Sequence, residues 1–375
     1  MTRPLAQLAV QGVSVWVDSI ARDWLEKGEL RRLRDEFAVV GVTSNPTIFQ
    51  AAMSVGSFYD EQLASLAREG LGAQEIFEHL ALYDVRWAAE EMAPVYEATG
   101  GVDGCVSYEV APDLARDTLK TTSEAARLFR SLDRPNVLIK IPATAEGLPA
   151  IRTSIADGIN VNVTLIFSIE RYRAVVEAYL SGLEERAAKG DDLSRIVSVA
   201  SFFVSRVDVL VDPELETRQQ VSGADTTLIL ARLGTAAIDN AKLAYEAWQK
   251  LFSGPRWQAL AEQGARPQRC LWASTSSKNP NYRDVIYSEE LIGRDTVNTM
   301  PLATIEAFDD HGEVRGQTVV SDLDRAHRLW ADLASLGIEE NRVSQQLEDE
   351  GVQKFAASYE AVLETVEAKC REALT

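Results

Sequence analysis

One lysine, Lys140, lies in an otherwise apolar segment, residues 136–142, that has the composition of a β-strand. Lysine side chains are almost never fully buried unless they are paired, so this one either reaches the surface from an edge strand or has a chemical purpose. A desolvated amine loses its proton more easily than an exposed one, and a neutral amine attacks a ketone to form a covalent iminium. The segment alone leaves both interpretations open.

Two carboxylates, Asp18 and Glu109, end similar apolar segments. Iminium chemistry needs a neutral amine, a group that carries protons to the carbinolamine, and a base for the hydroxyl whose ionisation breaks a carbon–carbon bond. Glu109 is the candidate proton carrier, through a water molecule oriented by Thr164, and Asp18 is the candidate base. Asp18 could instead cap a helix, and Glu109 could simply pair with Lys140.

A hydroxyl-rich segment, residues 271–280, contains Ser274, Ser276 and Lys278. Hydroxyl groups beside one cation are typical of an anion site, and barrel enzymes often bind phosphate in the loops after strands seven and eight. Arg206, just beyond the sixth predicted strand, could bind the same phosphate through two hydrogen bonds. An ordinary turn with a surface lysine is the alternative.

Eight short apolar, β-branched segments must position these residues. They are residues 13–18, 37–43, 105–110, 136–141, 159–166, 196–204, 270–275 and 295–300. Helical patterns lie between them, and this alternation predicts an α/β fold, a (β/α)8 TIM barrel with additional helices. An open doubly wound sheet would often carry a glycine-rich dinucleotide motif after its first strand, and this chain has none there.

The helical patterns also predict the domain organisation. They are residues 21–36, 57–68, 73–97, 115–132, 169–189 and 226–252. No linker or low-complexity tract divides the chain. We therefore expect one domain over residues 1–375, with helical insertions near 50–100 and 212–267 and a helical tail from about residue 321.

Side chains alternate between the two faces of a strand, and this alternation predicts which residues point into the barrel. In residues 158–165 the apolar side chains take one face, and Asn160, Asn162 and Thr164 take the other. The same reasoning groups inward-facing residues on the other strands: Asp18, Thr43, Asn45, Ser107, Glu109, Lys140, Ser201 and Phe203. Most of them lie toward the carboxyl ends of the strands, where barrel enzymes have their active sites.

Composition excludes several classes of protein. The chain has 375 residues, and its formal net charge of −19 disfavours nucleic-acid binding, which needs a basic surface. Its three cysteines form no metal-binding pair, which favours a reducing cytoplasm. The amino terminus does not have the pattern of a signal peptide, and no segment is long and apolar enough to predict a membrane span.

Seven segments, in this order along the chain, resemble the transaldolase family of class I aldolase-type barrels, and its longer bacterial branch in particular. They are VDS (17–19), GVTSNPTIF (41–49), VSYEV (106–110), LIKIPAT (138–144), GINVNVTL (158–165), SFFVSR (201–206) and ASTSSKNP (273–280). The resemblance implies transfer of a dihydroxyacetone unit, in the non-oxidative pentose phosphate pathway, from fructose 6-phosphate or sedoheptulose 7-phosphate to erythrose 4-phosphate or glyceraldehyde 3-phosphate. It implies no metal and no organic cofactor. Small sugar phosphates are the expected partners, and the protein is expected to be a monomer or homodimer.

The resemblance also assigns roles. Lys140 becomes the Schiff-base lysine, Glu109 the acid/base acting with Thr164, and Asp18 the base at the carbon–carbon bond. The implied substrate-binding residues are Asn45, Asn162, Ser201, Phe203, Arg206, Ser274, Ser276 and Lys278. Short transaldolases carry an arginine where this chain has Lys278, and residues 212–267 match them poorly.

Three rival functions remain open at this stage. A fructose-6-phosphate aldolase would cleave the donor without an acceptor. A glycosidase would use Asp18 and Glu109 as its carboxylate pair and leave Lys140 without a task. A sugar-phosphate-binding protein without catalysis would never form a covalent adduct.

Overall fold

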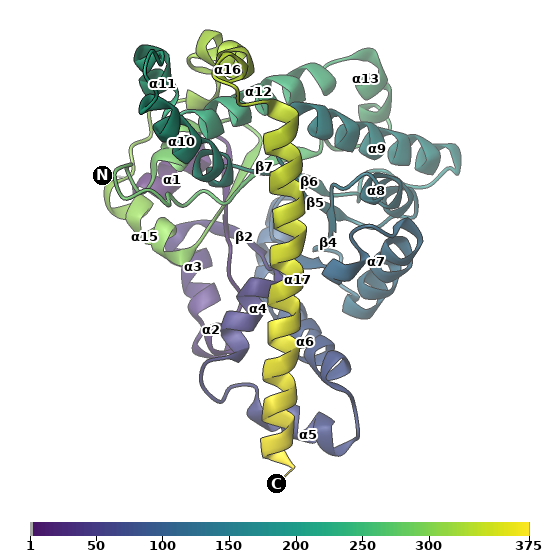
Figure 1. Ribbon diagram of the computed structural model, residues 1–375. Coiled ribbons are helices and arrows are strands. Elements are labelled where there is room, and N and C mark those ends of the chain that lie inside the picture. Colours follow the sequence, from purple (N-terminus) through teal and green to yellow (C-terminus); the bar gives the residue numbers. More distant parts are fainter. Residues whose placement is uncertain (1–2, 375) are drawn as a thin grey trace.

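The computed structural model describes residues 3–374 and has a closed barrel of eight parallel strands (Figure 1). The strands follow one another around the barrel in chain order, and β8 pairs with β1. They are β1 (Val13–Val17), β2 (Val39–Thr43), β3 (Cys105–Glu109), β4 (Val137–Pro142), β5 (Val161–Ile166), β6 (Ser198–Phe203), β7 (Arg269–Ala273) and β8 (Thr296–Met300). The predicted fold class is confirmed, and each strand lies within two residues of its expected ends.

Strand register places the polar side chains of neighbouring strands side by side. Glu109 of β3 is paired with Lys140 of β4, and Lys140 is paired in turn with Asn162 of β5. Because paired residues in adjacent strands point to the same face of a sheet, the three side chains share the interior of the barrel.

The amino-terminal end of the barrel is closed by packed side chains. Arg269 donates hydrogen bonds to Ser14 Oγ (2.8 Å) and to Asp103 Oδ1 (2.9 Å) there. Above this layer, the Trp16 ring fills the space beside Gly41, where a Cβ atom would lie 2.5 Å from the ring. The barrel is therefore a core at this end, and only its carboxyl end is open for a ligand.

Helices surround the barrel (Figure 1). They are α1 (Pro4–Val10), α2 (Arg22–Lys27), α3 (Glu29–Phe37), α4 (Pro46–Met53), α5 (Asp60–Arg68), α6 (Ala73–Ala98), α7 (Thr118–Leu132), α8 (Gly147–Ala156), α9 (Ile169–Ala188), α10 (Ser205–Gln219), α11 (Thr226–Arg232), α12 (Ala236–Leu251), α13 (Pro255–Ala261), α14 (Ile286–Glu290), α15 (Leu302–His311), α16 (Leu323–Ser335) and α17 (Glu340–Ala373). Within residues 3–374, none of the helices is long and apolar enough to cross a membrane.

Two of the predicted helices were wrong because a glycine breaks each of them. The pattern over 21–36 is divided into α2 and α3 at Gly28, which has a φ of 73°. The pattern over 226–252 is divided into α11 and α12 near Gly234, whose φ is 67°. Glycine adopts this left-handed conformation at little steric cost, so the chain turns there although the hydrophobic period continues.

The last helix, α17, crosses the molecule in front of the barrel in the view of Figure 1. Its 34 residues span about 50 Å at 1.5 Å per residue. Gly351 lets it approach the end of β5, since a Cβ there would lie 2.8 Å from Leu165. Further along, Ser358 hydrogen bonds to Thr47 (2.8 Å), and Lys369 donates to Asp60 (2.7 Å). The tail thus lies over the open end of the barrel.

Candidate active site

Lys140 is buried inside the barrel, with 4% of its surface exposed. Its Nζ donates a hydrogen bond to the backbone oxygen of Ser44 (3.0 Å) and lies 3.6 Å from Glu109 Oε2. Both side chains of this ion pair are almost completely removed from water. The edge-strand interpretation of the lysine is therefore wrong, because β4 lies between β3 and β5.

Glu109 is 8% exposed, and burial raises the pKa of its carboxyl group, although the nearby Lys140 opposes this shift. Its Oε2 has no hydrogen-bond partner within residues 3–374, and the same holds for Thr164 Oγ1. Buried polar atoms are usually hydrogen bonded, so these two are the atoms that a substrate or a water molecule would satisfy. A carboxyl group with a raised pKa is suited to carrying protons near neutral pH.

Asp18 follows β1 directly, and its backbone N–H donates to the oxygen of Met300 (2.8 Å). Its Oδ1 accepts a hydrogen bond from Thr43 Oγ1 (2.6 Å), which also contacts Thr299 Oγ1 (2.6 Å). Burial raises the pKa of Asp18, while Lys140 and the Thr43 hydroxyl lower it. The helix-cap interpretation is wrong, since α2 begins at Arg22 after a cap residue, Ala21, that has no capping side chain.

Three hydroxyl and amide side chains form a chain of hydrogen bonds around the barrel interior. Ser201 Oγ donates to Asn162 Oδ1 (2.7 Å), and Asn162 Nδ2 donates to Ser107 Oγ (3.0 Å). Asn162 does not line the cavity beside Lys140, and its contact with Ser201 orients that hydroxyl. Asn45 also has a structural contact, because its Oδ1 accepts from Ile48 N (3.1 Å) and caps α4.

The two predicted cations lie on neighbouring segments of the rim, Arg206 after β6 and Lys278 after β7. The Arg206 guanidinium carbon is 4.8 Å from the centroid of the Phe203 ring, and Lys278 Nζ donates to Ser276 Oγ (2.6 Å). Burial lowers the pKa of Arg206, and Asp18 and Glu109 oppose that shift. Burial also lowers the pKa of Lys278, and the positive charges of Lys354 and Arg206 add to the effect. Several cations close enough to repel one another favour an anionic ligand.

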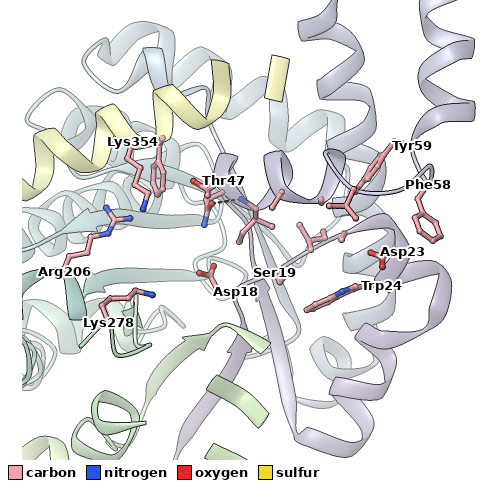
Figure 2. Close-up of a pocket in the computed structure, with 18 residues that line it drawn as sticks. Asp18, Ser19, Asp23, Trp24, Thr47, Phe58, Tyr59, Arg206, Lys278 and Lys354 are labelled. Atoms are coloured by element: carbon pink, nitrogen blue, oxygen red, sulfur yellow. Dashed lines mark hydrogen bonds between the residues drawn. The ribbon is translucent and has the colours of Figure 1, made fainter. Parts of the chain in front are cut away.

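One cavity of about 120 Å³ brings most of the predicted residues together. Ten of the twelve line it: Asp18, Asn45, Lys140, Thr164, Ser201, Phe203, Arg206, Ser274, Ser276 and Lys278. The exceptions are Asn162, behind Ser201, and Glu109, which lines an adjoining cavity. A wider pocket of about 560 Å³ continues outward, and Figure 2 shows Asp18 between Arg206 and Lys278 on one side and Trp24 and Phe58 on the other.

A sequence model described as "Transaldolase/Fructose-6-phosphate aldolase" matches residues 15–366. The chain belongs to this family. It is 52% identical to "Transaldolase" of Thermobifida fusca over 98% of both chains. It is also 51% identical to "Transaldolase 1" of Streptomyces coelicolor, over 96% of this chain and 93% of that relative. The "Transaldolase" of Mycolicibacterium smegmatis is 49% identical, over 97% of both chains. The predicted activity, that of a transaldolase and so of a transferase, is confirmed by these matches.

The candidate site contains residues that the sequence did not select. Thr43 had the right strand alternation but no assigned role, whereas Thr299 had no signal beyond its place in the eighth strand. Phe355 and Lys354 come from α17, and both line the pocket that Arg206 also lines. Figure 2 shows Lys354 beside Arg206. Phe355 is 4% exposed, and its ring centroid lies 6.0 Å from Lys140 Nζ. Nothing in the pattern of the acidic tail indicated this contact, because it depends on where the helix packs.

Proposed function

We propose that this protein transfers a dihydroxyacetone unit from a ketose phosphate, fructose 6-phosphate or sedoheptulose 7-phosphate, to an aldose phosphate through a Schiff base on Lys140. Erythrose 4-phosphate and glyceraldehyde 3-phosphate are the proposed acceptors. The observation that carries the proposal is the position of Lys140 Nζ. This nitrogen lies 3.6 Å from Glu109 Oε2. The Lys140 side chain is buried and lines a cavity that Asp18 also lines.

The first half of the reaction forms the iminium. Lys140 passes its ammonium proton to the neighbouring Glu109 carboxylate, and the resulting amine attacks the C2 carbonyl carbon of the ketose to give a carbinolamine. Glu109 then protonates the carbinolamine hydroxyl through a water molecule held with Thr164, and the hydroxyl leaves as water. The unpartnered Glu109 Oε2 and Thr164 Oγ1 support this relay, since one bridging water would satisfy both atoms.

The second half breaks and remakes a carbon–carbon bond. Asp18 takes the proton of the C4 hydroxyl, the C3–C4 bond breaks, and the electron pair moves into the iminium to give an enamine while the first aldose phosphate leaves. The enamine then attacks the acceptor aldehyde, and Asp18 returns the proton. Hydrolysis of the new iminium releases the product ketose and regenerates Lys140. The hydrogen bond from Thr43 keeps the Asp18 carboxylate directed toward the cavity.

The remaining residues would hold the substrates. Ser201, oriented by Asn162, and Asn45 line the cavity and would bind donor hydroxyls. Arg206 and Lys278 would bind the phosphate, and Ser274 and Ser276 would add hydroxyl donors at the same end. Lys354 of α17 adds a third positive charge to that rim. We infer that the phosphate lies there because the cations gather on one side of Asp18.

Transfer differs from simple cleavage because the enamine must survive until an acceptor arrives. Phe203 and Phe355 cover the inner cavity, and such exclusion of water favours transfer over discharge. The same cover separates this proposal from a fructose-6-phosphate aldolase. A glycosidase would leave unexplained why a lysine is buried beside Glu109.

The proposal is tested by trapping the covalent adduct. The protein is incubated with fructose 6-phosphate and reduced with borohydride, and the modified peptide is mapped by mass. We expect a three-carbon adduct on Lys140 and none in a Lys140→Ala variant, which should not turn over. Absence of the adduct from folded protein that binds the ligand would reject the iminium mechanism. Dependence of donor cleavage on an acceptor then distinguishes transferase from aldolase.

We also propose a cytoplasmic protein that forms one domain and acts as a monomer or homodimer without a cofactor. The three free cysteines, two of them buried, support the location. Light scattering coupled to size exclusion would give the oligomeric state.

A further inference from the structure

The loop that carries Lys278 has cavities on both sides. It spans residues 274–285, between β7 and α14. Lys278 lines the cavity that contains Lys140, and it also lines a separate hollow of about 300 Å³ bounded by Asp208, Asp212, Tyr282 and Tyr287. A loop with a hollow behind it is supported by few packed side chains. Its position therefore depends on the particular contacts that hold it.

Two tyrosine hydroxyls tie the segment after Lys278 to α10. Tyr282 donates a hydrogen bond to Asp212 Oδ2 (2.7 Å), and Tyr287 donates to Asp208 Oδ2 (2.9 Å). The two aspartates are four residues apart, so they lie on the same face of α10. The same helix carries Arg206 in its first turn. One helix thus presents the first cation and anchors the loop that presents the second.

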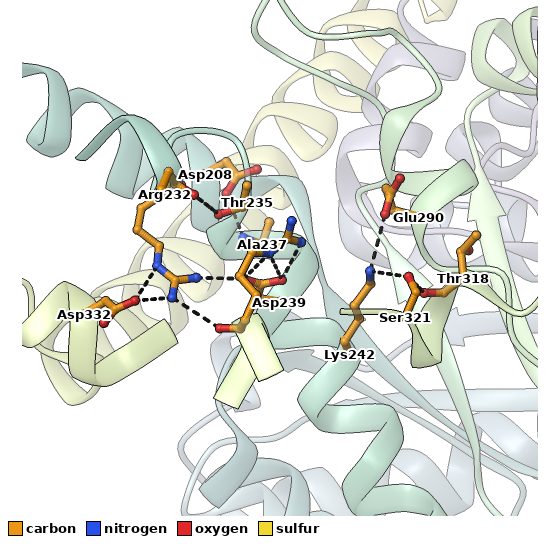
Figure 3. A network of polar contacts seen from close by, with 12 residues as sticks. Asp208, Arg232, Thr235, Ala237, Asp239, Lys242, Glu290, Thr318, Ser321 and Asp332 are labelled. Carbon is orange, nitrogen blue, oxygen red and sulfur yellow. Dashed lines mark hydrogen bonds and ion pairs between the residues drawn. The ribbon is translucent and has the colours of Figure 1, made fainter. Parts of the chain in front are cut away.

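Each aspartate is also fixed from behind. Asp212 Oδ1 accepts from the backbone N–H of Gly234 (3.1 Å). Asp208 Oδ1 accepts from the backbone N–H of Ala237 (2.7 Å; Figure 3). The Tyr282 ring packs on Gly234, where a Cβ would lie 2.7 Å from the ring. Asp212 is therefore held between the α11–α12 connection and the loop, and Asp208 between the start of α12 and α14. Each of the four carboxylate oxygens has a partner.

We propose that the Tyr282–Asp212 and Tyr287–Asp208 pairs are positioning residues, which fix the distance between Lys278 and Arg206 and so set the affinity for phosphorylated sugars. The proposal rests on the proposed function, in which these two cations bind phosphate. None of the four residues lines the cavity that contains Lys140. Their effect reaches the substrate only through the position of Lys278.

The test compares Tyr282→Phe, which removes one hydroxyl and keeps the ring on Gly234, with the unsubstituted protein. We expect KM for fructose 6-phosphate and the inhibition constant of inorganic phosphate to rise about tenfold, as expected when a hydrogen bond to a charged group is lost. We expect kcat, and kcat/KM for unphosphorylated fructose, to stay unchanged. Tyr179→Phe is the matched control, because its buried hydroxyl donates to Arg266 O (2.6 Å) away from the loop.

Three further variants keep the result interpretable. Asp212→Asn retains an oxygen for Gly234 and an amide that can donate to the Tyr282 oxygen, so we expect it to preserve phosphate affinity. Asp212→Ala removes both contacts and should lose as much phosphate affinity as Tyr282→Phe. An equal loss for fructose and fructose 6-phosphate in Tyr282→Phe, or no change in either, would overturn the positioning role. Lys278→Ala separates the two hypotheses. If it weakens phosphate binding and Tyr282→Phe does not, only the positioning role is refuted. If it has no effect, the phosphate assignment and the positioning role are both refuted.

Discussion

Replacing Glu109 with glutamine tests the centre of the proposed mechanism, because it removes one charge and keeps the size of the side chain. An amide can neither deliver a proton to the carbinolamine hydroxyl nor take one up. A positioned acid–base group contributes about 10²- to 10⁴-fold to a rate, so we expect kcat to fall within that range. KM should change little, since the phosphate end of the cavity is untouched.

The structure also sets the cost of this change for folding. Two opposite charges 3.6 Å apart attract by about 5 kcal/mol at an effective dielectric constant of 20. Loss of one member of a buried pair typically costs about 3–5 kcal/mol when the other stays charged. We therefore expect Glu109→Gln to lose at most about 5 kcal/mol of unfolding free energy.

Turnover is measured with fructose 6-phosphate and erythrose 4-phosphate by reduction of the released glyceraldehyde 3-phosphate, and stability is measured by urea unfolding. Asp239→Asn serves as the control. Its buried carboxylate accepts from Arg232 (2.9 Å) and Arg325 (2.7 Å) and does not line the substrate cavity (Figure 3). We expect the control to lose stability and keep its kcat. A folded Glu109→Gln protein with an unchanged kcat would refute the acid–base role, and so would an equal loss of kcat in the control.

Three further changes have expected outcomes. Lys278→Ala should raise KM for fructose 6-phosphate about tenfold and leave KM for unphosphorylated fructose unchanged. The effect is limited to about tenfold because Lys278 is exposed and its contact with phosphate is partly screened. Equal effects on both sugars would contradict this prediction. Phe355→Ala should lower the unfolding free energy measured in urea by about 3 kcal/mol. It should also increase cleavage of the donor in the absence of an acceptor, since water would reach Lys140. Donor cleavage that still requires an acceptor would show that Phe355 does not keep water from the site. Burial raises the pKa of Asp208 from 3.8 to about 7. The folded state therefore binds a proton that the unfolded state releases between about pH 4 and 7, and stability falls as pH rises through this window. The unfolding free energy of Asp208→Asn, relative to that of the unsubstituted protein, should thus be roughly 2–4 kcal/mol higher at pH 8 than at pH 4. If this relative free energy does not depend on pH, Asp208 is ionised in the folded protein.

The sequence by itself determined the barrel and most of the cavity. Strand periodicity is local, so the alternation in residues 158–165 was enough to predict which side of β5 faces inward. Because parallel strands expose their carboxyl ends at one face of a barrel, ten predicted residues from several strands meet in one cavity. The limits of two helices did not follow from the sequence pattern, since Gly28 and Gly234 break helices whose hydrophobic period continues.

Tertiary structure alone decided what surrounds that cavity. Phe355 is more than two hundred residues from Lys140 in the chain, and only the packing of α17 over the barrel brings their side chains to 6.0 Å. The Tyr282–Asp212 bond likewise joins a loop to a helix 70 residues earlier. Such contacts leave no local pattern, because they arise from how complete elements pack. The local hydrophobic period therefore determined the strands and their inward-facing residues. Long-range packing determined the position of Phe355 over the cavity and of the loop that carries Lys278.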